Sequence, residues 1–162
     1  YLQHFYLRNI MALTVHTSAP DFSALTDSGG SISLSDFKGK NIILYFYPKD
    51  NTSGCTQQAC DFRDSMERLT SKGFTVIGVS PDNVKSHGKF KKNFDLNFIL
   101  VSDEDKSICN NYGVWVEKSM YGRKYMGVER TTFIINERGI ITHVFPKVKV
   151  SGHVESILAI IE

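Results

Sequence analysis

Short apolar runs of the kind that form buried strands alternate along this chain with segments in which apolar residues recur every three or four positions. This alternation is the pattern of an α/β fold, because the runs pair into a sheet and the periodic segments cover that sheet as helices. At 162 residues the chain has the length of one domain. We therefore predict an α/β fold with a central mixed sheet flanked by helices.

Apolar runs rich in Ile, Leu, Val, Phe and Tyr are expected to form the strands. The first two are separated by a helical segment, which predicts a right-handed parallel crossover. The last two flank the turn at residues 136–139 and are expected to pair as an antiparallel hairpin. The predicted strands are residues 41–47, 74–79, 98–101, 131–135 and 140–145.

Helices are predicted where apolar residues fall on one face of a 3.6-residue period. The first of these segments is followed by Gly73, which ends it, and a later one opens on the polar residues 102–105, which resemble a capped start. The predicted helices are residues 56–71, a helix that follows Ser80-Pro81-Asp82, residues 102–110 and residues 154–161.

Two features precede the sheet. The pair Gly29-Gly30 predicts a turn between two short extended pieces that end at Leu34, and so an N-terminal hairpin extension. Met11 opens a segment that reads as a natural start. We assign residues 11–162 to a single domain and expect residues 1–10 to be disordered or to derive from an expression vector. The first residues lack the basic and clean apolar regions of a secretory signal.

The distribution of charge and the cysteine content limit the kinds of partner and the cellular compartment that we expect. The 19 basic and 17 acidic residues are spread along the chain, so no nucleic-acid surface is predicted, and the lysines at positions 89, 91 and 92 are expected on a solvated helix face. The longest apolar runs are too short to cross a bilayer. Three cysteines are too few for a secreted disulfide framework, which favours a reducing compartment, the cytoplasm.

The segment from Tyr47 to Cys55 joins a predicted strand to a predicted helix, and it holds the most informative cysteine. A thiol at a helix start meets free backbone N–H groups and the positive end of the helix dipole, which favour the thiolate. Gly54 lets a ligand approach the backbone, and the Thr52 hydroxyl can bond an oxygen atom held in the same loop. Cys55 is therefore predicted to be a nucleophile rather than a core residue.

A fixed cation beside the thiolate would stabilise it and polarise an oxygen–oxygen bond as the leaving oxygen becomes negative. Arg130 is the candidate, because it directly precedes a buried strand at the end of the sheet. Arg63 is the weaker candidate, since it lies well inside the helix and is expected to pair with Glu67 across one helical turn.

The other two cysteines differ in their expected roles. Cys60 follows Cys55 by five residues, which on an ideal helix separates the two Cα atoms by about 8.6 Å. A disulfide needs roughly 4.4–6.8 Å between Cα atoms, so a bond between these cysteines requires the first turns of the helix to unwind. Cys109, late in a short helix, is expected to be a small buried hydrophobe.

At this point the residues resemble those of a known family. The pattern Pro48-x-x-x-Thr52-x-x-Cys55 is similar to the active-site loop of peroxiredoxins. Cys60, five places after Gly54-Cys55-Thr56, resembles the bacterioferritin-comigratory, or peroxiredoxin Q, branch. The resemblance extends over residues 15–162 and includes Ala19-Pro20-Asp21-Phe22, Tyr121-Gly122-Arg123, Tyr125-Met126-Gly127 and Arg130-Thr131-Thr132-Phe133.

The resemblance implies a thioredoxin-like fold and a thiol-dependent peroxidase that reduces hydrogen peroxide and organic hydroperoxides in antioxidant defence. It implies that Cys55 is the peroxidatic cysteine, which passes through a sulfenic acid. It makes Cys60 the resolving cysteine, and the resulting intramolecular Cys55–Cys60 disulfide is recycled by thioredoxin or a similar dithiol protein. Neither a metal nor an organic cofactor is expected.

The resemblance also assigns roles around these cysteines. Pro48 shields the thiolate with Tyr47 beside it, and Gln58 supports the arginine. The activating residues are Thr52 and Arg130. Ser53 departs from the pattern, because the family commonly has a proline before the glycine of this loop, and that substitution bears on the rigidity of the loop.

Two other functions remain open from the residues. A thiol–disulfide oxidoreductase of the same fold normally uses Cys-x-x-Cys, whereas four residues separate Cys55 from Cys60. A metal-binding or structural protein would use the three cysteines together with His87, His143 or His153, which are otherwise expected at the surface or in loops. An internal resolving cysteine removes the chemical need for a second subunit, so a monomer is expected.

Overall fold

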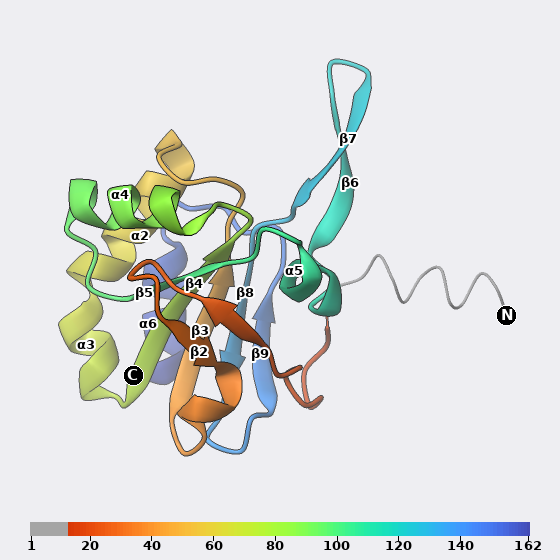
Figure 1. Ribbon diagram of the computed structural model, residues 1–162. Coiled ribbons are helices and arrows are strands. Elements are labelled where there is room, and N and C mark those ends of the chain that lie inside the picture. Colours follow the sequence, from red (N-terminus) through yellow and green to blue (C-terminus); the bar gives the residue numbers. More distant parts are fainter. Residues whose placement is uncertain (1–12) are drawn as a thin grey trace, which may run out of the picture.

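The computed structural model describes residues 13–162 and shows a five-stranded mixed sheet with helices packed against it (Figure 1). The strand order is β5-β4-β3-β8-β9. β3, β4 and β5 are parallel, whereas β8 is antiparallel to both β3 and β9. The predicted parallel pairing of the first two strands and the antiparallel hairpin are therefore confirmed. The strands are β3 (Asn41–Phe46), β4 (Phe74–Ser80), β5 (Ile99–Ser102), β8 (Thr131–Ile135) and β9 (Ile141–Phe145).

The central strand β3 is buried on both faces, and its side chains alternate between two core layers. Ile42, Leu44 and Phe46 pack into one layer, and Ile43 and Tyr45 pack into the other. This alternation follows from the two-residue repeat of a strand, and burial on both faces is typical of sheets that helices cover on each side. The carboxyl end of β3 consequently emerges between the two layers, where the loop to the next helix begins.

The two core layers are closed by different elements. The layer that holds Tyr45 receives apolar side chains from α2 (Ser53–Asp64), α3 (Met66–Ser71), α4 (Val84–Phe94) and α6 (His153–Ile161). The other layer is closed by the 3₁₀ helix η1 (Leu34–Phe37), α5 (Ser107–Asn111) and the N-terminal hairpin of β1 (Ser23–Leu25) and β2 (Ser31–Ser33).

The N-terminal hairpin confirms the expectation drawn from Gly29-Gly30, because β1 and β2 are antiparallel and Gly29 adopts a positive φ of 85° in the turn between them. The expectation for residues 1–10 lies outside the described residues. In the part of the chain that the structure describes, no helix is long and apolar enough to cross a membrane.

The predicted helix over residues 56–71 was wrong at both its start and its continuity. The structure divides this segment into α2 and α3 at Ser65, whose φ of −99° and ψ of 4° leave the helical region. The backbone N–H of Ser65 is shared between the carbonyls of Asp61 and Phe62, as happens where a helix tightens at its end. The periodic apolar pattern continues across the break, which is why it predicted one helix.

The helix predicted over residues 102–110 begins five residues later, at Ser107. Lys106 has a positive φ of 62°, which keeps the preceding segment out of the helix. The buried carboxylate of Asp103 accepts hydrogen bonds from the backbone N–H groups of Ile108 (3.0 Å) and Cys109 (2.8 Å). Asp103 therefore caps the helix from a distance, and sequence spacing alone did not show this.

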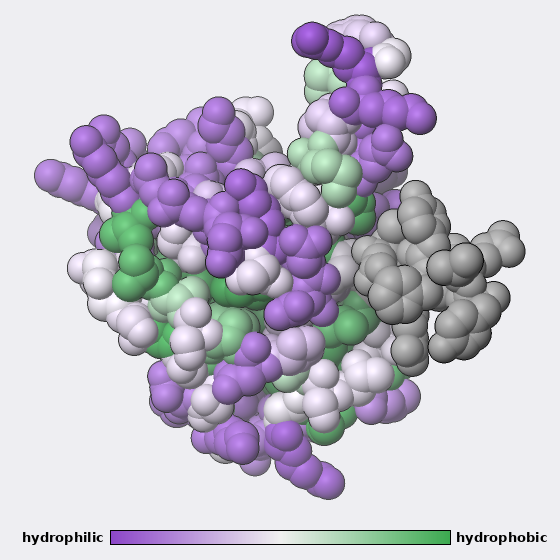
Figure 2. Space-filling model, turned by 45° about the vertical axis from the view of Figure 1, so that its right-hand side comes forward, coloured by the Kyte–Doolittle hydropathy of each residue, from purple (hydrophilic) through white to green (hydrophobic). Residues whose placement is uncertain are grey.

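A second hairpin was not predicted. β6 (Trp115–Met120) and β7 (Arg123–Val128) pair with each other and project from the body (Figure 1). Figure 2 shows mainly hydrophilic side chains at the tip of this projection, with paler, more apolar ones toward the body. Its turn residues Tyr121 and Gly122 both have positive φ, as a two-residue hairpin turn requires. Tyrosine is uncommon in that conformation, which concealed the turn.

Candidate active site

Cys55 lies in the first turn of α2, which begins at Ser53, three residues earlier than predicted. This position leaves its backbone N–H among those that have no partner further up the helix, at the positive end of the helix dipole. The residue is 2% exposed and its side chain joins the core layer beside Ala59 and Phe62. The two residues before it, Ser53 and Gly54, line a surface hollow, and Cys55 itself is not part of that lining.

Arg130 reaches Cys55 from the start of β8, whose first residue pairs with Phe46 at the end of β3. Its Nη2 donates to the Sγ of Cys55 at 3.3 Å, and its Nη1 donates to the Oε1 of Gln58 at 2.6 Å. Arg130 directly precedes β8, and its backbone carbonyl accepts a bond from the N–H of Val148, so both ends of the residue are held. The guanidinium therefore has a fixed direction toward the sulfur, and the prediction that Arg130 stands beside Cys55 agrees with this geometry.

The rival cation, Arg63, points elsewhere. It bonds the carboxylate of Asp64 at 2.9 Å and the backbone carbonyl of Phe94 at 2.6 Å. The expected pair with Glu67 is not the one that forms. Arg63 thus ties α2 to the end of α4, and Arg130 is the guanidinium that contacts Cys55.

The loop between β3 and α2 brings the other predicted residues to this end of the sheet. Pro48 is half-buried, and Thr52 is the exposed residue that precedes α2. The Thr52 hydroxyl donates to the carbonyl of Lys49 at 2.8 Å, which leaves its oxygen free to accept a hydrogen bond. Tyr47 is buried, and its hydroxyl donates to Asp50 at 2.7 Å, so it supports the loop and does not bond the sulfur.

Gly54 lies under the guanidinium. A Cβ added there would meet the Nη2 of Arg130 at 3.5 Å, which is an ordinary van der Waals contact. The absence of a side chain therefore leaves room for the arginine and for a small ligand, as the sequence suggested, although a single methyl group would still fit.

The remaining cysteines occupy different environments. Cys60 is half-buried on the same helix as Cys55, and Cys109 is fully buried among apolar side chains. Burial and the neighbouring Asp103 raise the pKa of the Cys109 thiol far above its ordinary value. Cys109 therefore behaves as the small hydrophobe that the sequence predicted.

Comparisons with known proteins agree with this geometry. The sequence model of the AhpC/TSA family matches residues 15–144. Peroxiredoxin Bcp of Bacillus subtilis is 45% identical over 148 residues, which cover 91% of this chain and 94% of that protein. The chain belongs to the peroxiredoxin family.

Two solved structures place this peroxiredoxin in the peroxiredoxin Q branch. PrxQ of Xylella fastidiosa has a TM-score of 0.87 at 33% identity and covers 92% of this chain and 95% of its own. The bacterioferritin comigratory protein of Xanthomonas campestris has a TM-score of 0.85 at 36% identity, covers 93% and 97%, and was solved to examine alkyl peroxide reduction. The thioredoxin-like fold is thus confirmed, and the protein is a thiol-dependent peroxidase that uses a thioredoxin-type reductant.

Sequence reasoning missed one tyrosine of this peroxiredoxin site. Tyr45 lies under α2, where its ring stacks on Phe62 at 4.6 Å between centroids. Burial raises the pKa of its phenol, and the nearby Cys55 raises it further. Among residues 13–162, two buried side-chain atoms have no hydrogen-bond partner, the Tyr45 hydroxyl and the Nε2 of Gln58. Gln58 belongs to α2 and Tyr45 packs beneath that helix, so their unmade bonds reduce the stability of its first turns.

The histidine predictions need correction. His87 is fully buried and His153 is buried, whereas both were expected at the surface or in loops. Within the described residues, the cluster whose atoms could surround a metal ion is Asp50, Asp82 and His87, and it contains no cysteine. The rival metal site built on cysteines is therefore not the arrangement found, and the three members of this cluster are bound by hydrogen bonds to one another and to their neighbours.

Proposed function

We propose that Cys55 is the peroxidatic residue of this peroxidase and that Arg130 activates it. The observation that carries the proposal is the 3.3 Å contact between the guanidinium and the sulfur at a helix start. The thiolate attacks one peroxide oxygen, the oxygen–oxygen bond breaks, and the leaving oxygen takes a proton to become water or an alcohol. The sulfur is oxidised to a sulfenic acid, and the peroxide is reduced.

The loop residues complete the peroxide site in this proposal. The oxygen of Thr52 accepts the hydrogen of the hydroperoxide, because its own hydrogen is donated to Lys49. Arg130 stabilises the negative charge that develops on the leaving oxygen, and Pro48 shields the sulfur from water. Organic hydroperoxides are expected as substrates beside hydrogen peroxide, as the alkyl peroxide reduction studied in the Xanthomonas relative suggests.

We assign the resolving step to Cys60. Both cysteines lie within the continuous helix α2, in which residues five apart cannot bond without a change of backbone. The first turns of α2 must therefore unwind before the sulfur of Cys60 displaces hydroxide from the sulfenic acid to form the disulfide and water. The unpartnered groups of Tyr45 and Gln58 lower the cost of this opening.

We further propose that the protein acts as a monomer in the cytoplasm and that thioredoxin is its reductant. A resolving cysteine on the same helix needs no second subunit, which supports the monomer. Three cysteines and no secreted framework support a reducing compartment. Sedimentation of the reduced protein at several concentrations tests the monomer, and a dimer at all concentrations would contradict it.

Mass spectrometry after one equivalent of peroxide tests the cysteine roles. The expected product has lost two hydrogens and carries a disulfide bond between Cys55 and Cys60. Cys109→Ala should give the same product. A link from Cys55 to Cys109, or between two chains, would contradict the assignment of Cys60.

Peroxide consumption distinguishes the proposed peroxidase from a thiol–disulfide oxidoreductase. Cys55→Ser should abolish peroxide reduction by the protein with thioredoxin present. Wild-type protein that reduces disulfides but consumes no peroxide would support the rival.

A further inference from the structure

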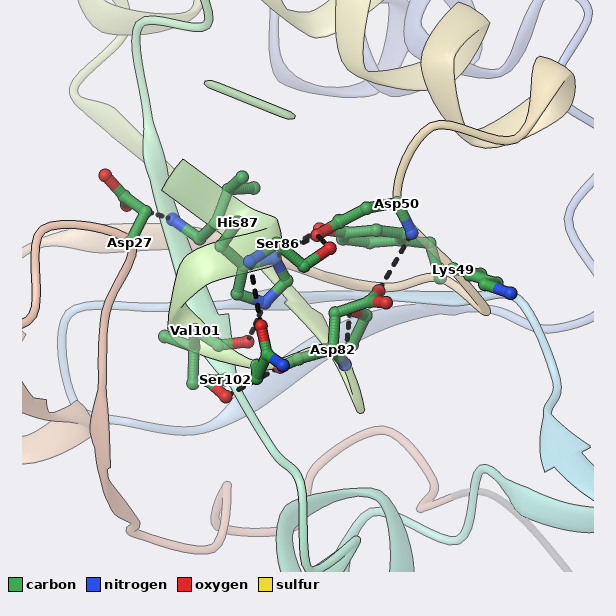
Figure 3. Close-up of polar contacts among 12 residues, drawn as sticks. Asp27, Lys49, Asp50, Asp82, Ser86, His87, Val101 and Ser102 are labelled. Atoms are coloured by element: carbon green, nitrogen blue, oxygen red, sulfur yellow. Dashed lines mark hydrogen bonds and ion pairs between the residues drawn. The ribbon is translucent and has the colours of Figure 1, made fainter. Parts of the chain in front are cut away.

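A buried polar network lies behind the peroxide loop and connects it to α4 (Figure 3). Its centre is Asp50, whose side chain is 1% exposed, and His87, whose side chain is fully buried. The carboxylate of Asp50 accepts hydrogen bonds from the hydroxyls of Tyr47 (2.7 Å) and Ser86 (2.8 Å) and lies 2.7 Å from the Nδ1 of His87. Nothing in the reaction described above uses this pair.

The contacts of His87 define its protonation. Its Nδ1 faces the Asp50 carboxylate, and its Nε2 lies 3.0 Å from the backbone carbonyl of Val101. Both partners are acceptors, so both ring nitrogens must donate, and the ring is an imidazolium. The two oxygens of Asp50 also accept hydrogen bonds from two hydroxyl groups, so both of them serve as acceptors. The network therefore contains a buried ion pair whose charges compensate each other.

The main chain of the loop is held by the same segment. The backbone N–H of Asp50 donates to the Oδ2 of Asp82 at 2.8 Å, and the same oxygen accepts from the Ser80 hydroxyl at 2.6 Å. Asp82 lies between β4 and α4, so Asp50 is bound there through both its backbone and its side chain. Asp50 in turn lies between Pro48 and Thr52, the loop residues assigned to the peroxide.

The charge of Asp50 also bears on the sulfur. The pKa of the Tyr45 phenol is raised by burial and then by the charges of Cys55 and Asp50, so both anions lie near the same hydroxyl. An Asp50 carboxylate without its imidazolium would place an uncompensated negative charge in this buried region and oppose the thiolate.

We propose that the His87 imidazolium is a positioning residue for peroxide reduction, which acts through Asp50 to fix the loop that carries Pro48 and Thr52. The inference rests on the proposed function of that loop. It predicts that the pair controls the attack on peroxide, which needs the folded loop, and leaves disulfide closure unaffected, because closure requires only that α2 unwinds.

The test is rapid mixing of the reduced protein with hydrogen peroxide, with separate measurement of Cys55 oxidation and of disulfide closure. His87→Gln is expected to slow oxidation roughly 10- to 100-fold, as a misplaced reacting group does, with closure within about twofold of wild type. His143→Gln is the matched control, because His143 is half-buried and bonds its neighbour Thr142. The control should change neither rate.

His87→Gln leaves a buried carboxylate unpaired, and this can prevent folding. The double variant Asp50→Asn with His87→Gln removes both charges and is expected to fold, with oxidation at least roughly tenfold slow. Oxidation at the wild-type rate in a folded variant would overturn the inference. So would a fall of both rates by the same factor, since that indicates a general structural effect.

A spectroscopic measurement tests the charge state independently. Nitrogen-15 spectra of the reduced wild-type protein at neutral pH should show a hydrogen on both ring nitrogens of His87, and a single protonated nitrogen would overturn the imidazolium. The two proposals fail differently: wild-type protein that consumes no peroxide refutes the proposed function, whereas active wild type with an equally active His87 variant refutes only this inference.

Discussion

The guanidinium of Arg130 is fixed by Gln58, with 2.6 Å between the Nη1 of the arginine and the Oε1 of the amide. Its second terminal nitrogen is then directed at the sulfur of Cys55. Two parallel donors on a planar group give a direction as well as a charge, which a lysine cannot reproduce. The helix that presents the cysteine therefore also presents the residue that aims the cation at it.

Arg130→Lys is expected to lower the rate of Cys55 oxidation by about 10²–10³, the usual loss when one preorganised donor is removed from a reaction centre. The charge remains, but the fork that joins Gln58 and the sulfur is lost. The measurement is stopped-flow oxidation by hydrogen peroxide. Arg63→Lys is the control, because Arg63 bonds Asp64 and Phe94. Equal rates for both variants would show that direction is unimportant.

Substitutions of Gly54 by a small and by a larger side chain are expected to differ in their effect on Cys55 oxidation. Because a Cβ would lie 3.5 Å from the Nη2 of Arg130, Gly54→Ala should keep oxidation within about threefold of wild type, whereas the larger Gly54→Val should displace the guanidinium and cost roughly tenfold or more. Both variants retain a helix-compatible backbone, so circular dichroism should match wild type. A severe loss with alanine would mean that the ligand itself occupies this space.

Cys109→Ala is expected to leave peroxidase activity unchanged and to lower the free energy of unfolding by about 1–2 kcal/mol through lost packing. The side chain is fully buried, and the pKa of its thiol is raised by burial. Urea denaturation and a coupled thioredoxin assay measure the two effects. Loss of turnover without loss of stability would give Cys109 a role that its surroundings do not indicate.

The sequence was sufficient for features that depend on local pattern. The sheet, its parallel and antiparallel pairs and the N-terminal hairpin followed from runs of apolar residues and from glycine turns. Cys55 and Arg130 could be paired because Cys55 follows one strand at a helix start and Arg130 directly precedes another strand. The fold brings these two residues together at one end of the sheet.

Features that depend on contacts between distant segments were not predictable. His87 lies on a helix of mixed polarity, and only its bond to Asp50, 37 residues away, explains its burial. Asp103 delays a helix by accepting bonds from residues five and six positions ahead. In the sequence, Tyr45 is indistinguishable from other strand residues. Only the packing of α2 over it brings two cysteines near its hydroxyl.

Gly78 is closely packed against its neighbours. A Cβ there would lie 3.0 Å from two ring atoms of Tyr45 and 3.1 Å from Leu100, so these side chains would have to shift by a few tenths of an ångström. Gly78→Ala should therefore push the tyrosine ring toward α2 and reduce the free energy of unfolding by about 1–3 kcal/mol. Thermal unfolding of the reduced protein measures the loss. An unchanged melting temperature would show that the ring moves freely.

His153 should make stability depend on pH. Burial, and then the charge of Arg130, lower its pKa to about 4, so the folded protein holds it neutral, with its Nε2 2.8 Å from the Thr132 hydroxyl. The unfolded chain takes up the proton near pH 6.5. Between these values the unfolded state binds more protons, so stability is complete above pH 6.5 and falls as the pH decreases toward 4.

His153→Gln removes this titration and can keep the bond to Thr132. The wild-type free energy of unfolding should fall by on the order of 2 kcal/mol more than that of the variant between pH 7 and pH 4.5, because only the wild type gains a proton at this site on unfolding. Urea titrations at half-unit intervals measure the difference. If the free energies of unfolding of the two proteins change in parallel with pH, the lowered pKa of His153 is contradicted. A steeper fall for the variant would mean that the pKa shift has the opposite sign.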